Sequence, residues 1–166
     1  MTPHTYQTTV TWSAAGGPGT AGYRSYSRNH SIAAGAKPEI AASSDPAFRG
    51  DRERYNPEEL LLASISSCHM LWYLHLCAVN GIVVREYRDR AVGRMVTQAD
   101  GAGQFVRAEL HPLVEISAPS DPARALALHE EAHRLCFIAR SVNFDIEVMP
   151  EVSNVTSEDS DAGPSE

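Results

Sequence analysis

The sequence is short of positive charge and of cysteine, and both shortages exclude classes of function. The 14 Lys and Arg residues against 21 Asp and Glu leave a formal charge of −7, whereas nucleic acids and anionic membranes need clustered basic side chains. Only three cysteines occur in 166 residues, and a chain of this length buries about two thirds of its unfolded surface without disulfides. We therefore expect one domain that acts on a small neutral or apolar molecule.

Leader and membrane segments are also lacking. The start, MTPHTYQTTVTW, has neither a basic stretch nor an apolar run, so it does not look like a signal peptide. The apolar run from Leu60 to Val79 has no Asp, Glu, Lys or Arg over 20 residues, but serines and histidines interrupt it, which favours a core helix over a membrane span. We expect a cytoplasmic protein, in which any disulfide is transient and catalytic.

The first third of the chain predicts a hairpin, an irregular stretch and a helix. Residues 6–12 and 23–32 flank the turn GGPG and predict two paired strands. Residues 33–55 are rich in Ala, Ser, Pro and Gly and predict a long loop. Asn56 is a natural N-cap with Pro57 in the first helical position. The helix is expected to end at Asn80-Gly81.

The remaining chain predicts a second hairpin, a second helix and a closing strand. Residues 82–96 and 104–117 flank the turn ADGAG. Asp121 caps a helix that runs towards Cys136, and residues 143–149 alternate as a strand. We expect an α+β domain over residues 1–150. The acidic, serine-rich residues 151–166 are expected to be a disordered tail.

The three cysteines cannot all meet. Cys68 and Cys77 are nine residues apart on one predicted helix, so they point about 180° apart. Cys136, near the end of the second helix, can therefore meet one of them but not both, and the spacing leaves the choice open. Small neighbours and His69 favour Cys68 as the reactive thiol, whereas leucines and a valine crowd Cys77.

A reactive thiolate needs a cation nearby, and four of the arginines before the helix are candidates. These are Arg28, Arg49, Arg52 and Arg54. Glu58 could orient such an arginine, but it precedes Cys68 by ten residues, about 15 Å along a straight helix. Either the helix begins late and the chain folds back, or Glu58 serves a site whose cysteine comes from another subunit.

The second helix contains a competing motif, His129-Glu130-Glu131-Ala132-His133. It matches H-E-x-x-H, in which two histidines hold zinc and the glutamate activates water. No further His or Glu follows at a suitable helical spacing. We therefore expect these histidines to face solvent. A zinc hydrolase is the alternative, and stoichiometric metal in the purified protein would reveal it.

One stretch carries a family resemblance. YNPEELLLASISSCHMLWYLHLCAVNGI resembles the central helix of the OsmC/Ohr family, the osmotically inducible and organic hydroperoxide resistance proteins. The family signature is N-P-E-[EQ]-L followed by a cysteine ten residues after the first glutamate, which Asn56, Pro57, Glu58, Leu60 and Cys68 match. Cys136 occupies the place of the second family cysteine, and the likeness covers roughly residues 5–150.

The resemblance implies an intertwined α+β homodimer, with long central helices packed against antiparallel sheets and active sites at the interface. It implies a thiol peroxidase that reduces organic hydroperoxides without metal or flavin. Cys68 would form a sulfenic acid, Cys136 would resolve it as a disulfide, and an external dithiol, lipoyl-type or similar, would reduce that disulfide. A dimeric stress or binding protein without peroxidase activity is the other reading of the same resemblance.

The resemblance also implies that an arginine lowers the pKa of Cys68 and that Glu58 orients this arginine. Arg49 is preferred because FRGD before NPEEL resembles the OsmC branch, and Arg28 is the alternative in the manner of the Ohr branch. Two positions depart from the family pattern. Phe137 replaces the usual proline after the second cysteine, and His69 follows Cys68 where many members have an apolar residue.

Overall fold

The computed structural model describes residues 2–155, and the chain divides into two compact units between Leu61 and Leu62. The first unit holds a three-stranded antiparallel sheet of β1 (Thr9–Thr11), β2 (His30–Ala33) and β3 (Ile40–Ala42). The expected N-terminal pairing of β1 with β2 is confirmed. However, β2 is shorter than predicted, and β3 lies in the stretch that was predicted to be irregular.

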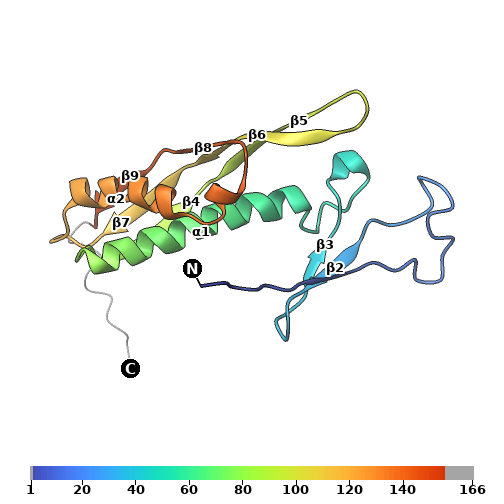
Figure 1. Ribbon diagram of the computed structural model, residues 1–166, viewed down its shortest axis with the longest axis horizontal. Coiled ribbons are helices and arrows are strands. Elements are labelled where there is room, and N and C mark those ends of the chain that lie inside the picture. The colour runs from blue at the N-terminus through green and yellow to red at the C-terminus, as the bar shows by residue number, and fades with distance from the viewer. Residues whose placement is uncertain (1, 156–166) are drawn as a thin grey trace. The chain divides into compact units, whose positions relative to one another are not determined.

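Helix α1 (Pro57–Val79) begins and ends where the sequence predicts (Figure 1). The Asn56 side-chain oxygen accepts the Glu59 N–H at 2.8 Å, and the Glu59 carboxylate accepts the Asn56 N–H at 3.1 Å. This reciprocal capping satisfies two backbone donors at the start of the helix. At the other end, Gly81 has a φ of 72°, a left-handed conformation that glycine adopts without strain and that stops the helix.

The second unit contains the rest of α1, two three-stranded sheets and a second helix. Strands β4 (Val84–Asp89), β7 (Pro112–Ile116) and β9 (Glu151–Asn154) form one sheet. Strands β5 (Val92–Thr97), β6 (Gly103–Leu110) and β8 (Asp145–Val148) form the other. The second helix is α2 (Pro122–Leu135), and a short 3₁₀ turn, η2 (Ala139–Ser141), follows it.

The predicted second hairpin is confirmed, with each of its arms divided into two strands. β5 pairs with β6 and β4 pairs with β7, both antiparallel. The arms break next to Asp89, whose carboxylate accepts the backbone N–H of His111 at 2.7 Å. A side chain that takes over a backbone donor in this way ends the regular ladder, so the long hairpin bends here.

Both C-terminal strands join the sheets in parallel, β8 beside β6 and β9 beside β7. Residues 151–154, predicted to begin a disordered tail, are therefore a strand, because Val152 pairs beside the buried Val114. The rest of the predicted tail, residues 156–166, lies outside the described residues. The α+β class is confirmed, and the single domain predicted over residues 1–150 stays a prediction.

Helices α1 and α2 share one core with the β4–β7–β9 sheet. Tyr73, Leu76 and Cys77 of α1 pack with Ala125 and Leu128 of α2, and with Val114 and Ile116 of β7. Burial of such side chains contributes roughly 1.5–3 kcal/mol each. The core thus fixes α2 against α1, and this contact positions the groups described below.

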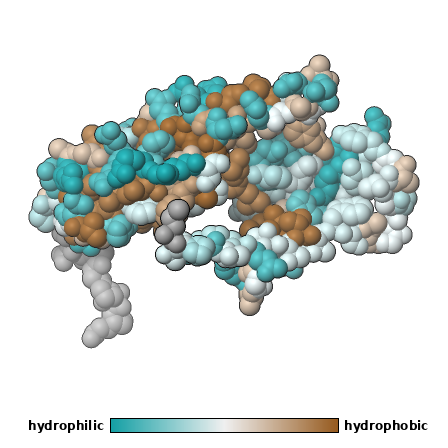
Figure 2. All heavy atoms as spheres, in the orientation of Figure 1, coloured by the Kyte–Doolittle hydropathy of each residue, from teal (hydrophilic) through white to brown (hydrophobic). Residues whose placement is uncertain are grey.

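Helix α1 is also long and apolar enough to cross a membrane, by length and composition alone. Core helices of soluble proteins have the same properties, and one side of α1 lies in the core just described. Another side remains exposed. Leu71 and Val79 are 63% and 65% exposed, and apolar surface follows this helix in Figure 2. An exposed apolar strip of this kind is typical of a surface that binds a partner.

Candidate functional site

Cys68 and Cys136 lie side by side in the second unit. Cys68, in the middle of α1, is partly exposed, whereas Cys136 is fully buried at the end of α2. Burial raises the pKa of Cys136 to about 11, and the neighbouring Cys68 thiol adds to this rise. Both thiols are free. The structure therefore pairs Cys136 with Cys68, a choice that the sequence leaves open between Cys68 and Cys77.

Cys136 is positioned by the C-terminal end of α2. Its backbone N–H donates to the His133 carbonyl at 3.3 Å, and its extended backbone ends the helix. The Ala139 N–H points back at the Cys136 sulfur at 3.5 Å. The thiol is thus enclosed by the last helical turn and by η2. Burial favours the protonated form of this thiol, and the Ala139 N–H offsets part of that effect on its pKa.

Cys77 occupies the opposite side of α1, as the helical spacing predicts. It is 1% exposed and belongs to the core with Tyr73 and Val114. Burial raises the pKa of its thiol. Cys77 therefore behaves as a small apolar core residue.

Arg49 projects from a tightly built loop of the first unit. Asp45 caps the 3₁₀ turn η1 (Pro46–Phe48), and its carboxylate accepts the Ala47 N–H at 2.7 Å. Arg49 itself has a left-handed backbone with φ 67°, a conformation that costs a non-glycine residue roughly 1 kcal/mol or more. A Cβ on Gly50 would lie 1.5 Å from the Ser44 carbonyl oxygen, so only glycine fits there.

The Arg49 guanidinium is exposed, and within residues 2–155 no carboxylate forms an ion pair with it. The guanidinium carbon of Arg49 lies over the Tyr23 ring, 5.8 Å from the ring centroid. A strained backbone that presents an unpaired cation is typical of a functional position. The choice of Arg49 over Arg28 stays a prediction.

Arg28, the alternative, is already engaged inside the first unit. Its guanidinium donates to the carbonyls of Tyr26 and Tyr23, both at 2.7 Å. It also stacks over both rings, at 4.0 Å from Tyr26 and 4.8 Å from Tyr23. Through these contacts Arg28 stabilises the loop between β1 and β2. Of the other two candidates, Arg54 lies 3.4 Å from Asp51, and Arg52 is exposed.

A polar network in the first unit joins the segments that carry the two arginines. Asn29 donates to the Asp51 carboxylate at 3.1 Å and accepts the hydroxyl of the buried Ser43 at 2.9 Å. A hydrogen bond from the Glu53 backbone N–H lowers the pKa of Asp51, and a smaller contribution comes from the hydrogen bond of the Asn29 side chain. Hydrogen bonds to Asn29 therefore hold the loop that ends in Arg49-Gly50-Asp51 in place.

Glu58 stands in the first turn of α1, and the helix runs unbroken from there to Cys68. A late helix start with a chain that folds back is therefore excluded. About 15 Å of helix axis separates Glu58 from Cys68. Glu59, not Glu58, takes part in the capping, and one oxygen of the Glu58 carboxylate is buried without a hydrogen-bond partner among the described residues. Glu58 is thus available to bind a cation from elsewhere.

The H-E-x-x-H motif does not form a metal centre in the described part of the chain. No three His, Cys, Asp or Glu side chains of residues 2–155 are grouped so that they could hold a metal ion. The prediction that the motif histidines face solvent is wrong for His129, which is 3% exposed. The reason is that His129 lies on the face of α2 that packs against α1 together with Leu128 and Ala132.

A buried histidine pair is the feature that the sequence analysis missed. His69 Nε2 lies 3.0 Å from His129 Nδ1, within hydrogen-bond distance. The two rings are nearly parallel, 11° apart, with their centroids 5.3 Å from each other, and Tyr73 stacks on the His129 ring at 3.8 Å. The sequence signal is faint. His69 falls on the same helical stripe as the buried Ile65, Tyr73 and Leu76, which places it inside.

The pair predicts a loss of stability in weak acid. Burial lowers the pKa of His69 to about 4 and that of His129 to about 3, below the ordinary value of 6.5. The unfolded chain therefore binds protons that the folded chain cannot. The free energy of unfolding has its full value above about pH 6.5. It falls as the pH drops towards 4, by roughly 1.4 kcal/mol per pH unit for each histidine. Urea unfolding at pH 7, 6 and 5 measures this decline.

A His129→Asn variant is the matched control, since only one buried histidine then remains and the dependence on pH is roughly halved. An unfolding free energy that stays constant between pH 7 and 5 in the unaltered protein would contradict this account. Carboxylates titrate mainly below this window.

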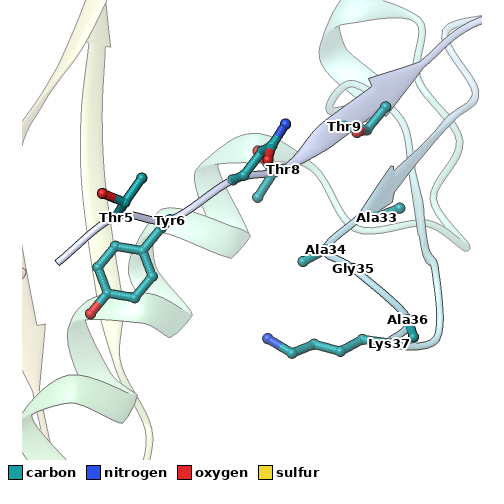
Figure 3. A pocket seen from close by; sticks show the side chains of 10 residues that line it. Thr5, Tyr6, Thr8, Thr9, Ala33, Ala34, Gly35, Ala36 and Lys37 are labelled. Atoms are coloured by element: carbon teal, nitrogen blue, oxygen red, sulfur yellow. The ribbon is translucent and has the colours of Figure 1, made fainter.

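A separate hollow of about 980 Å³ lies within the first unit (Figure 3). The N-terminal segment and the turn between β2 and β3 line it, with Tyr6, Thr8, Ala34 and Lys37 among the lining residues. None of the predicted site residues borders it. The hollow is therefore distinct from the thiol pair.

Comparisons with known proteins agree with the fold. The model of a protein family described as OsmC, OsmC-like protein, matches residues 50–151. An OsmC-like protein of unknown function from Vibrio cholerae is similar in structure with a TM-score of 0.81. It is 29% identical, and the match covers 90% of this chain and 100% of that one.

Two organic hydroperoxide resistance proteins share the fold at lower identity. The protein from Elizabethkingia anophelis is 22% identical with a TM-score of 0.66, over 93% of this chain and 99% of that one. The protein from Legionella pneumophila is 17% identical with a TM-score of 0.63, over 91% and 99%. No curated protein matches the chain.

Proposed function

The chain belongs to the OsmC-like family, and from this premise we propose that it is a thiol peroxidase that reduces organic hydroperoxides to alcohols. The observation that carries the proposal is the pair formed by a partly exposed Cys68 and a buried Cys136. One thiol is accessible to a substrate, and the other is buried beside it. Relatives described as organic hydroperoxide resistance proteins support the same chemistry.

The first step uses Cys68 alone. Its thiolate attacks the outer oxygen of the hydroperoxide, the O–O bond breaks, and the alkoxide leaves and takes up a proton to become the alcohol. Cys68 is oxidised to the sulfenic acid. The thiolate needs a cation beside it, and Arg49 is the candidate because its guanidinium is exposed and unpaired within the described residues.

The second step uses the buried thiol. The Cys136 sulfur attacks the Cys68 sulfur, the S–S bond forms, and the S–O bond breaks, so that the oxygen leaves as water with the proton of Cys136. An external dithiol, lipoyl-type or similar, then reduces the disulfide by two exchange steps. The high pKa of Cys136 keeps it from reacting directly with peroxide.

The proposal includes a homodimer with active sites at the interface. Two observations support it. Glu58 is about 15 Å of helix from Cys68 on its own chain yet has a carboxylate oxygen without a partner among the described residues. Exposed Leu71 and Val79 also leave an apolar strip along α1. In such a dimer Glu58 would orient the arginine of a shared site. We place the protein in the cytoplasm, where reduced dithiols are available.

Peroxide titration with intact-mass analysis tests the proposal. One equivalent of cumene hydroperoxide, added to the reduced protein without reductant, is expected to remove two mass units, and peptide mapping should locate a Cys68–Cys136 disulfide. Dihydrolipoamide should restore the original mass. The Cys77→Ser variant should behave in the same way. A protein that keeps its reduced mass under these conditions would instead be a binding or stress protein whose cysteines are core residues.

A further inference from the structure

The histidine pair bridges the two helices that carry the two thiols. His69 follows Cys68 directly on α1, and His129 lies two turns before Cys136 on α2. The hydrogen bond between their rings, 3.0 Å long and buried, joins the helices beside the thiol pair. We call the His69–His129 contact the histidine bridge. It is absent from the family pattern described above, in which an apolar residue commonly follows the first cysteine.

The bridge is costly for a contact that only fills space. The outer nitrogens, Nδ1 of His69 and Nε2 of His129, are buried without hydrogen-bond partners among the described residues. Each unsatisfied polar atom of this kind costs roughly 1–3 kcal/mol, which two apolar side chains of similar size would avoid. Unlike two apolar side chains, the histidines form a directional contact. Their hydrogen bond fixes how far α2 is shifted along α1 and how it is rotated relative to it.

The relative position of α1 and α2 matters because disulfide formation depends on the distance and angle between the Cys68 and Cys136 sulfur atoms. Cys136 is the C-cap residue of α2, so the position of that helix places its thiol beside Cys68. Reactions between two held groups lose roughly 100-fold when the groups are displaced by about 1 Å. The Tyr73 ring, stacked on His129 at 3.8 Å, also holds this ring in place. The bridge therefore acts at the helix contact that sets the distance between the thiols.

We propose that His69 and His129 are positioning residues that hold Cys136 ready to resolve the Cys68 sulfenic acid. This inference rests on the proposed peroxidase function. The sulfenic acid has two fates. Cys136 can convert it to the disulfide with release of water, or a second hydroperoxide can transfer an oxygen to it, which yields the sulfinic acid and another alcohol. The bridge favours the first fate by keeping the buried thiol in place.

The test compares an apolar replacement with replacements that keep the hydrogen bond. His129→Leu removes the bridge. His129→Asn keeps a polar group at the position of Nδ1, and His69→Gln keeps one at the position of Nε2. Each reduced protein is mixed with one to ten equivalents of cumene hydroperoxide without reductant. Stopped-flow loss of hydroperoxide reports the first step, and quenched samples analysed by mass report disulfide and sulfinic acid.

In His129→Leu, the rate of disulfide formation should fall by roughly 10- to 100-fold, and sulfinic acid should rise accordingly. The second-order rate of the first step, which does not use Cys136, should stay within about threefold of the unaltered protein. The two amide variants should recover most of the disulfide. His111→Asn replaces a histidine outside the thiol pair and its helices, and it should leave both rates as they are.

Three results would overturn the bridge as a positioning device. These are an unchanged share of disulfide in His129→Leu, amide variants no better than leucine, or an equal fall of both rates. Near-ultraviolet circular dichroism identifies a variant that has lost its packing. If His129→Leu is unfolded, His69→Leu removes the bridge from the other helix and is compared with the same amide variants. If the unaltered protein itself forms no sulfenic acid or disulfide, the peroxidase proposal fails, which is a different outcome.

Discussion

Cys68→Ser is expected to abolish the consumption of cumene hydroperoxide, with a loss of roughly three orders of magnitude or more in kcat/KM. Serine keeps the size and the place on α1, but its hydroxyl is not deprotonated near neutral pH and is a far weaker nucleophile than a thiolate. The fold should survive, because Cys68 is partly exposed and outside the core cluster. The assay follows hydroperoxide loss with dihydrolipoamide as the reductant.

Cys77→Ser is the matched control on the same helix. It introduces a hydroxyl into a site that is 1% exposed, so it should lower stability by about 1–3 kcal/mol while leaving kcat/KM close to that of the unaltered protein. Equal turnover by the Cys68→Ser variant would refute the peroxidase mechanism. Cys136→Ser completes the series, since it should still consume one equivalent of hydroperoxide and then stop as the sulfenic or sulfinic acid.

Arg49→Ala carries the second large expected effect, a loss of roughly 100-fold in kcat/KM. The proposed cause is that the guanidinium stabilises the Cys68 thiolate and the charge that develops on the departing oxygen. The rate at which iodoacetamide alkylates Cys68 at a fixed pH should fall as a result. Lysine at this position should recover only part of the rate, because it lacks the planar fork of donors.

Arg28→Ala provides the contrast. Its guanidinium holds the carbonyls of Tyr23 and Tyr26 and stacks on both rings. Removal should therefore loosen the loop between β1 and β2, seen as faster proteolysis there, while the alkylation rate of Cys68 changes less than in Arg49→Ala. If Arg28→Ala slows the alkylation of Cys68 and Arg49→Ala leaves it unchanged, the roles of the two arginines are exchanged.

Local signals predicted the helices well. Asn56 and Asp121 each cap a helix, and each is followed by a proline in the first turn. The information needed for these boundaries lies within a few residues. The pairing of the second hairpin was also predictable, because its turn residues sit between two alternating segments.

Tertiary contacts explain what the sequence analysis missed. β3 and β9 are short strands whose residues carry little pattern of their own, and they are strands only because β2 and β7 offer a free edge. The burial of His129 depends on which face of α2 meets α1, and the motif H-E-x-x-H drew attention to a different chemistry. The partner of Cys136 likewise depended on the packing of two helices.

The parallel pairing of β8 and β9 has a consequence for the order of folding. Each of these strands pairs with one that lies roughly forty residues earlier, β8 with β6 and β9 with β7, and contacts between distant residues form slowly. The hairpins of the preceding chain are local and can form first. Helix α2 contacts both β8 and β9, so its docking is complete only when these strands have paired. The nascent protein should therefore bring Cys136 to Cys68 only in the last stage of folding.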